Sequence, residues 1–150
     1  MSPRVRAAGA GLLAGVLALG VTSCGDQEKS YCAALSADQE LFAAMADDTS
    51  GLALLKHRTA LHQLADKAPS DLGDEWQTFL GAVDAFAKTL GDAKVKPGDF
   101  VDGQAPAGLD PAVRARIAGA ANELSSDDVV QAADGIEQQA KDVCKLQLGL

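Results

Sequence analysis

The stretch that decides the fold is DLGDEWQTFLGAVDAFAKTLG, residues 71–91. Its apolar residues recur at intervals of three and four, the spacing that places them on one face of an α-helix. They are Leu72, Trp76, Phe79, Leu80, Val83, Phe86, Ala87 and Leu90. Ser70 or Asp71 is a suitable N-cap, and Gly91 is a suitable C-terminal stop. A helix with one continuous apolar face predicts burial against other helices.

The same helical period recurs on both sides of this stretch, and no segment alternates with period two for long enough to predict a strand. We predict helices over about 30–46 and 52–67, and two more after Asp110 and after residues 125–128. Asp110 followed by Pro111 is typical of a helix start. Four or five amphipathic helices bury their apolar faces most simply as an up-and-down bundle, so the fold class is all-α.

The first 24 residues have the pattern of a secretion signal. Arg4 and Arg6 precede an apolar run over 7–20, which is long enough for a signal peptide and shorter than the ~20 residues of a spanning helix. The run ends in Val21-Thr22-Ser23-Cys24, which resembles the lipobox of bacterial lipoproteins. The alternative is a plain secretory signal with a chance cysteine, which leaves the position of Cys24 unexplained.

The lipobox resemblance implies a specific processing and location. Residues 1–23 would be removed as a signal peptide, and Cys24 would become the lipid-bearing N-terminus on the outer face of the bacterial cell membrane. Two acyl chains give a stable anchor, whereas one gives only marginal binding. A short polar tether, 24–29, would then precede a helical domain over 30–150.

The other two cysteines predict a disulfide. An exported chain is in an oxidising setting, where Cys32 and Cys144 have only one intrachain pairing, between the start and the end of the domain. Two free thiols or an intermolecular bridge are the alternatives. We expect no metal site, because neither cysteine has a second ligand at the usual spacing.

The mature chain is strongly acidic. Without Arg4 and Arg6 it carries 11 basic and 21 acidic residues, a net charge of −10. Nucleic acids and anionic lipid surfaces are bound through cationic patches, so this charge argues against both as partners.

Beyond the lipobox, the chain resembles the small, helical, cysteine-bridged lipoproteins of high-GC Gram-positive bacteria. The residues that carry this resemblance are Tyr31-Cys32, Ala68-Pro69 before Asp74-Glu75-Trp76, and Val143-Cys144. The resemblance implies the fold and the location, and no activity.

Two polar residues interrupt the apolar stripes and form a candidate cluster. Asp38 falls within the first helix stripe, and His57 falls within the second with Arg58 at its flank. In a hairpin that turns near Thr49 these positions nearly face each other, and buried polar groups need partners. We therefore expect Asp38 to pair with Arg58 or His57, as a ligand site, a pH-sensitive switch or a structural pair. Alternatively, Asp38 is a helix N-cap.

Catalytic and cofactor motifs are absent from the sequence, so we expect no enzyme and no cofactor. His57 and His62 point roughly 140° apart on one helix and do not easily share a metal. The long loop over 92–109 contains Asp99 and Asp102, but it lacks the pattern of a calcium loop. We expect Val95, Phe100 or Val101 to fix it against the bundle, and Trp76 to lie in the core.

These features leave two expected functions, while a third, an enzyme, would need a pocket that brings His57 or His62 together with an acid and a nucleophile. The first is a lipid-anchored module that binds another envelope or extracellular protein, which an exposed apolar patch of several hundred Å² would favour. The second is a lipoprotein that binds a small molecule or ion, which a pocket between helices with convergent polar groups would favour.

Overall fold

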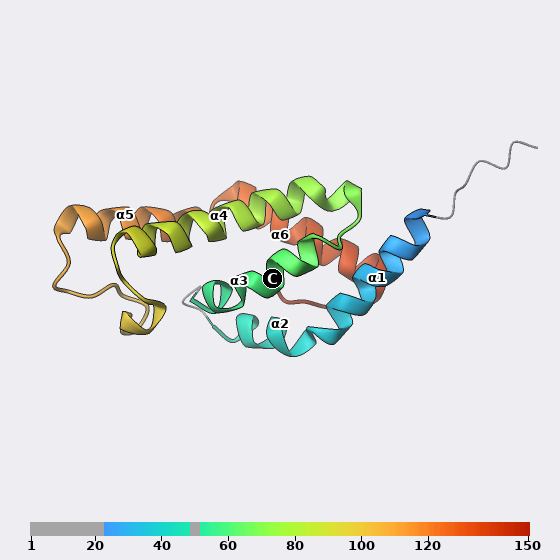
Figure 1. Ribbon diagram of the computed structural model, residues 1–150, viewed down its shortest axis with the longest axis horizontal. Helices are drawn as coiled ribbons and strands as arrows, with labels where there is room; N and C mark the ends of the chain where they lie inside the picture. The colour runs from blue at the N-terminus through green and yellow to red at the C-terminus, as the bar shows by residue number, and fades with distance from the viewer. Residues whose placement is uncertain (1–22, 49–51) are drawn as a thin grey trace, which may run out of the picture.

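The fold is all-α, as predicted, in a computed structural model that describes residues 23–48 and 52–150 (Figure 1). Its helices are α1 Ser23–Ala37, α2 Gln39–Ala46, α3 Leu52–Ala65, α4 Gly73–Asp92, α5 Pro111–Glu123 and α6 Asp127–Gln139. Short turns of helix are η1 Ser70–Leu72, η2 Pro97–Asp99 and η3 Ala140–Cys144. Over the described ranges, the extended structure consists of one isolated bridge between Val101 and Gln104.

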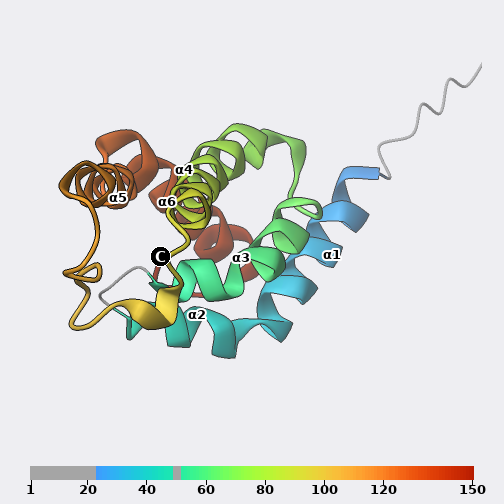
Figure 2. The same ribbon diagram turned by 60° about the vertical axis from the view of Figure 1, so that its left-hand side comes forward.

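Helix α4 is the centre of the bundle. It packs most extensively against α6, and also against α3 and α5. Helix α1 lies at one end of the long axis, where it contacts η3, α2 and α3, while α5 and the loop that precedes it lie at the other end (Figures 1 and 2). The bundle therefore has an α1 end and an α5 end.

The apolar stripe of α4 is buried as predicted. Seven of its side chains belong to the core, and Ala87 is half-buried; the seven are Leu72, Trp76, Phe79, Leu80, Val83, Phe86 and Leu90. In the described part of the chain, the buried side chains form two clusters. The larger cluster joins α1, α2, α3, α4 and α6, and the smaller one, at the α5 end, contains Phe86, Leu90, Val95 and Ile117.

The segment expected as one helix over 30–46 is two helices with a break at Asp38. The backbone of Asp38 has φ −100° and ψ 17°, outside the helical region, and its side chain makes no capping hydrogen bond. Aspartate is a weak helix former that favours helix ends. The change of direction lets Leu35 on α1 and Phe42 on α2 both reach the core.

Helix α1 also starts earlier than expected. The residues predicted as a polar tether, 24–29, are helical, and the Gln27 Nε2 donates a hydrogen bond to the Ala68 carbonyl at 2.9 Å. The structure therefore connects this segment to the bundle.

The loop between α4 and α5 is held by apolar side chains. Val95 is buried in the smaller cluster and Phe100 packs against it, whereas Val101 is 71% exposed. Asp110 caps α5 as expected, because its Oδ1 accepts the Ala112 N–H at 2.8 Å.

The C-terminal segment 145–150 folds back along α6. Lys145 takes a left-handed conformation, φ 59°, at the end of η3, and reverses the chain. Glu137 on α6 then accepts the backbone N–H groups of Leu148 and Gly149, both at 2.9 Å, and Leu148 is buried. This segment forms one wall of an apolar pocket.

Candidate functional site

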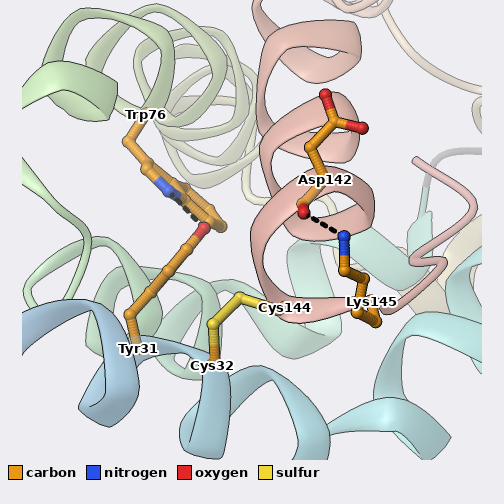
Figure 3. The surroundings of a disulfide bond; sticks show 6 residues. All are labelled: Tyr31, Cys32, Trp76, Asp142, Cys144 and Lys145. Atoms are coloured by element: carbon orange, nitrogen blue, oxygen red, sulfur yellow. Dashed lines mark hydrogen bonds between the residues drawn. A yellow bond between two sulfur atoms is a disulfide. The ribbon is translucent and has the colours of Figure 1, made fainter. Parts of the chain in front are cut away.

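The disulfide predicted from the cysteine count is present. Cys32 on α1 is bonded to Cys144 at the end of η3, with an S–S distance of 1.96 Å and a sequence separation of 112 residues (Figure 3). It joins the two ends of the described domain and thereby closes about three quarters of the chain into one loop.

A buried aromatic pair lies beside the disulfide (Figure 3). Trp76 Nε1 on α4 donates to Tyr31 Oη on α1 at 3.0 Å, and the rings are nearly perpendicular with centroids 6.5 Å apart. Burial raises the pKa of Tyr31 to about 12, against the smaller opposing effect of the hydrogen bond from Trp76. The hydroxyl is therefore neutral at physiological pH, and this part of the molecule has a structural role.

The turn after the disulfide is closed by a lysine. Lys145 Nζ donates to the Asp142 carbonyl at 2.6 Å, which satisfies a carbonyl at the end of η3 (Figure 3). The Asp142 carboxylate accepts from Gln138 one turn earlier on the same side of α6 and η3. These contacts fix the point where segment 145–150 departs.

The polar cluster has a different acidic member from the one expected. Arg58 contacts Asp84 on α4, with 2.6 Å between Arg58 Nε and Asp84 Oδ1, and His62 Nε2 lies 3.1 Å from the same oxygen. No described hydrogen bond joins Asp38 to Arg58 or to His57. The physical reason is that α3 turns the face carrying positions 58 and 62 toward α4, against which it packs more extensively than against α2.

This cluster is on the surface. The side chains of Arg58, His62 and Asp84 are 47%, 43% and 39% exposed, and no charged side chain of the described part is fully buried. Partial burial works to raise the pKa of Asp84, but the hydrogen bonds from His62 and Arg58 and their charges outweigh it and lower that pKa. Because this cluster is exposed, it is a contact between α3 and α4 that contributes little to the stability of the fold.

An apolar pocket lies between α2, α3, α4, α6 and segment 145–150. It has a volume of about 210 Å³. Most of its wall is apolar, and two carboxylates complete it; the lining residues are Met45, Asp48, Ala53, Leu54, Phe79, Leu124, Val129, Val130, Ala133, Asp134, Gly149 and Leu150. Asp48 also accepts the Ala53 N–H at 2.5 Å near the start of α3. Sequence patterns alone did not indicate this pocket.

Residues considered for metal binding are separated in the structure. Within the described ranges, no three His, Cys, Asp or Glu side chains are close enough to hold a metal ion. In the loop before α5, Asp99 Oδ2 accepts the backbone N–H of Lys96 at 2.8 Å. The carboxylate of Asp99 is thus used to close the η2 turn.

Comparisons with protein-family models, with curated proteins and with solved structures find no match for this chain. Of the helices that the structure describes, none is both long and apolar enough to span a bilayer.

Proposed function

We propose that the chain is an exported lipoprotein, held on the outer face of a bacterial cytoplasmic membrane by lipid on Cys24, and that its bundle binds another envelope or extracellular protein. The observation that carries the proposal is the Cys32–Cys144 disulfide. Disulfides persist in oxidising compartments outside the cytoplasm, so the bond agrees with the export signal.

The direction of α1 supports a tethered module. Helix α1 starts at Ser23, and its N-terminal end lies at the edge of the bundle with residues 25–27 exposed, although Gln27 contacts Ala68 (Figures 1 and 2). An anchor at residue 24 is then at the α1 end of the long axis. The α5 end, with its loop, points away from the anchor and is free to meet a partner.

The distribution of charge supports the same orientation. Residues 88–123, at the α5 end, contain five basic and five acidic residues, whereas the rest of the mature chain contains six basic and sixteen acidic residues. Anionic lipid headgroups repel the acidic part near the anchor. This repulsion keeps the bundle from lying along the surface, and the anchor at the α1 end directs the neutral α5 end outward.

The partner interface that we propose is polar and transient. The large apolar side chains most exposed in the described part are Val101, Val130 and Val143, which lie on three separate elements. Single exposed valines are ordinary, while obligate interfaces bury large continuous apolar areas. The apolar patch expected for a protein-binding module is therefore not found on the described surface, and the contact that we propose is made by polar groups around the α5 end.

The anchor is tested by mass spectrometry of the protein extracted from membranes, before and after reduction. We expect the mass of a chain that begins at Cys24 with diacylglycerol attached, and a gain of two hydrogens on reduction. The Cys24→Ser variant is expected to lose the lipid and the membrane association. Equal processing and equal membrane association of this variant contradict the anchor.

The partner site is tested by photo-crosslinking in intact cells. A photoreactive residue at Val101, at the α5 end, is compared with one at exposed Gln77 near the start of α4. We expect a discrete crosslinked protein from position 101 that disappears in the Cys24→Ser background, and none from position 77. Equal products from both positions, or none from 101, contradict the proposal.

A further inference from the structure

We propose that the pocket between α2, α3, α4, α6 and segment 145–150 binds a small organic ammonium ion with an apolar body. This ligand site is separate from the proposed partner surface, because none of its lining residues belongs to the loop before α5. It does not depend on the lipid anchor.

The volume and the walls of the pocket limit the size of the ligand. The innermost lining side chains include Phe79, Val129 and Ala133, all of which belong to the core. A cavity of ~150 Å³ holds benzene, and pockets for drug-sized ligands begin near ~300 Å³. A pocket of about 210 Å³ therefore fits a chain of about six carbons, and it is too small for a folded peptide segment.

The rim of the pocket selects the charge. Asp48 and Asp134 are the ionisable side chains of the described lining, and no Lys, Arg or His is among it. The carboxylate of Asp48 is held in place by the Ala53 N–H. An ammonium group therefore finds two carboxylates on the rim while its alkyl body replaces water on the apolar wall.

Two helix starts near the pocket act in the opposite direction. Ala53 and Leu54 belong to the first turn of α3, and Val129 and Val130 belong to the first turn of α6. A helix start carries about half a positive charge, which favours an anion. Two carboxylates oppose these two half charges, and the carboxylate of Asp48 is bonded directly to the start of α3, so the carboxylates outweigh the helix ends.

The apolar wall continues outward at Val130. This side chain is 47% exposed, one of the few large apolar side chains in the described part with so much contact with water. A ligand body that covers it removes apolar surface from water at ~25 cal/mol per Å². Val130 is also a position where a substitution changes the rim with little effect on the core.

The experiment measures binding of three probes with the same six-carbon chain. They are n-hexylammonium, 1-hexanol and hexanoate, titrated by NMR into the isolated protein, whether or not it carries lipid, with the amide signals of Ala133 and Gly149 as reporters. We expect n-hexylammonium to bind about tenfold more tightly than hexanoate, with 1-hexanol between them, because of the two rim carboxylates. Equal affinity of the charged probes, tighter binding of hexanoate, or no shift of these amides with any probe overturns the proposal.

Variants separate the pocket from the general charge of the protein. Asp134→Asn is expected to weaken n-hexylammonium binding several-fold and leave 1-hexanol unchanged. The matched control is Asp102→Asn, which removes the same charge from the distant loop and is expected to change neither. Val130→Lys puts a cation on the rim beside the two carboxylates and is expected to reduce the preference for n-hexylammonium over hexanoate. Equal effects of the two Asn variants, or an unchanged preference in Val130→Lys, overturn the proposal, and melting curves confirm that each variant is folded.

Discussion

Removal of the disulfide tests the reasoning about the fold most directly. The change is Cys32→Ser together with Cys144→Ser, which leaves no thiol where the bond was. The bond restricts the unfolded chain, because it closes a loop spanning 112 residues. Its loss therefore stabilises the unfolded state by restoring conformational freedom.

The size of the effect follows from the loop length. For a separation of 112 residues the chain-entropy relation gives about 4.8 kcal/mol at 25 °C. Measured values for disulfides are usually about 2–4 kcal/mol. A domain of this size has a total stability of about 5–15 kcal/mol, so the variant should retain its fold with a much reduced margin.

Guanidinium unfolding followed by tryptophan fluorescence measures the change. The single tryptophan, Trp76, is buried and bonded to Tyr31, the residue next to Cys32, so it reports on the region that the disulfide holds. We expect the midpoint to fall by about 1 M, from a loss of about 3–5 kcal/mol and the usual slope in guanidinium. Reductant should produce the same shift in the wild-type protein and none in the double variant.

A loss below about 1 kcal/mol in a wild-type protein shown by mass to be oxidised would refute the reasoning. That outcome would mean that the unfolded chain already holds its two ends together, or that the bond strains the folded state. Cys24→Ser is the matched control, because it removes a cysteine outside the loop and is expected to leave the midpoint unchanged.

Three further changes test individual contacts. Tyr31→Phe removes the acceptor of the Trp76 indole N–H and leaves a buried donor unpaired, so we expect a loss of about 1–3 kcal/mol in chemical unfolding, and an unchanged midpoint would contradict the pairing. The contacts that lower the pKa of Asp84 in the folded state stabilise the fold in full at pH values above the ordinary pKa of 3.8. This stabilisation is lost as the pH falls through the lowered pKa of the folded state. Because the ion pair is exposed, we expect it to contribute no more than a few tenths of a kcal/mol to the free energy of unfolding. The melting temperature of the Asp84→Asn variant should depend less on pH over this acidic range than that of the wild type. Identical pH profiles of the two proteins would argue against the contact. Asp110→Ala removes the cap of α5 and should cost about 0.5–2 kcal/mol, whereas Asp110→Asn should retain most of it, with thermal unfolding as the measurement.

The sequence predicts those parts of the fold that depend on local pattern. The period of α4 requires its large side chains to lie on one face, and the structure buries them in the two clusters. The Asp110-Pro111 pair identified a helix start from two adjacent residues. The disulfide followed from counting, since one intrachain pairing is left if the chain is exported and lipid occupies Cys24, as we propose.

Features that depend on how helices rotate against one another were not predictable in this way. Asp38 was expected to face Arg58, but α3 directs Arg58 toward Asp84. The i, i+4 spacing of Arg58 and His62 was the available signal, because two basic groups on one helix face favour an acidic partner. Nothing in the sequence identified which helix supplies it.

The pocket was missed for a related reason. One of its walls is segment 145–150, which reaches α6 through the carboxylate of Glu137. The carboxylate of Glu137 accepts backbone N–H groups that lie eleven and twelve residues further along the chain, and a contact of this kind leaves no periodic pattern in the sequence. The position of Asp134 beside Val130 on one side of α6 was visible in the sequence, but the facing wall was not.

The position of the disulfide has a consequence for biogenesis. Cys32 is eight residues from Cys24 and 112 residues from Cys144, so chance encounter in the unfolded chain favours the nearer thiol by about 2.3 kcal/mol. If lipid occupies the sulfur of Cys24, acylation also acts as a protecting group that removes the competing partner. The order of oxidation and acylation then determines which disulfide forms. A precursor that is oxidised before acylation accumulates a disulfide between Cys24 and Cys32, which peptide mapping detects. In a precursor that is acylated first, Cys144 is the remaining partner of Cys32.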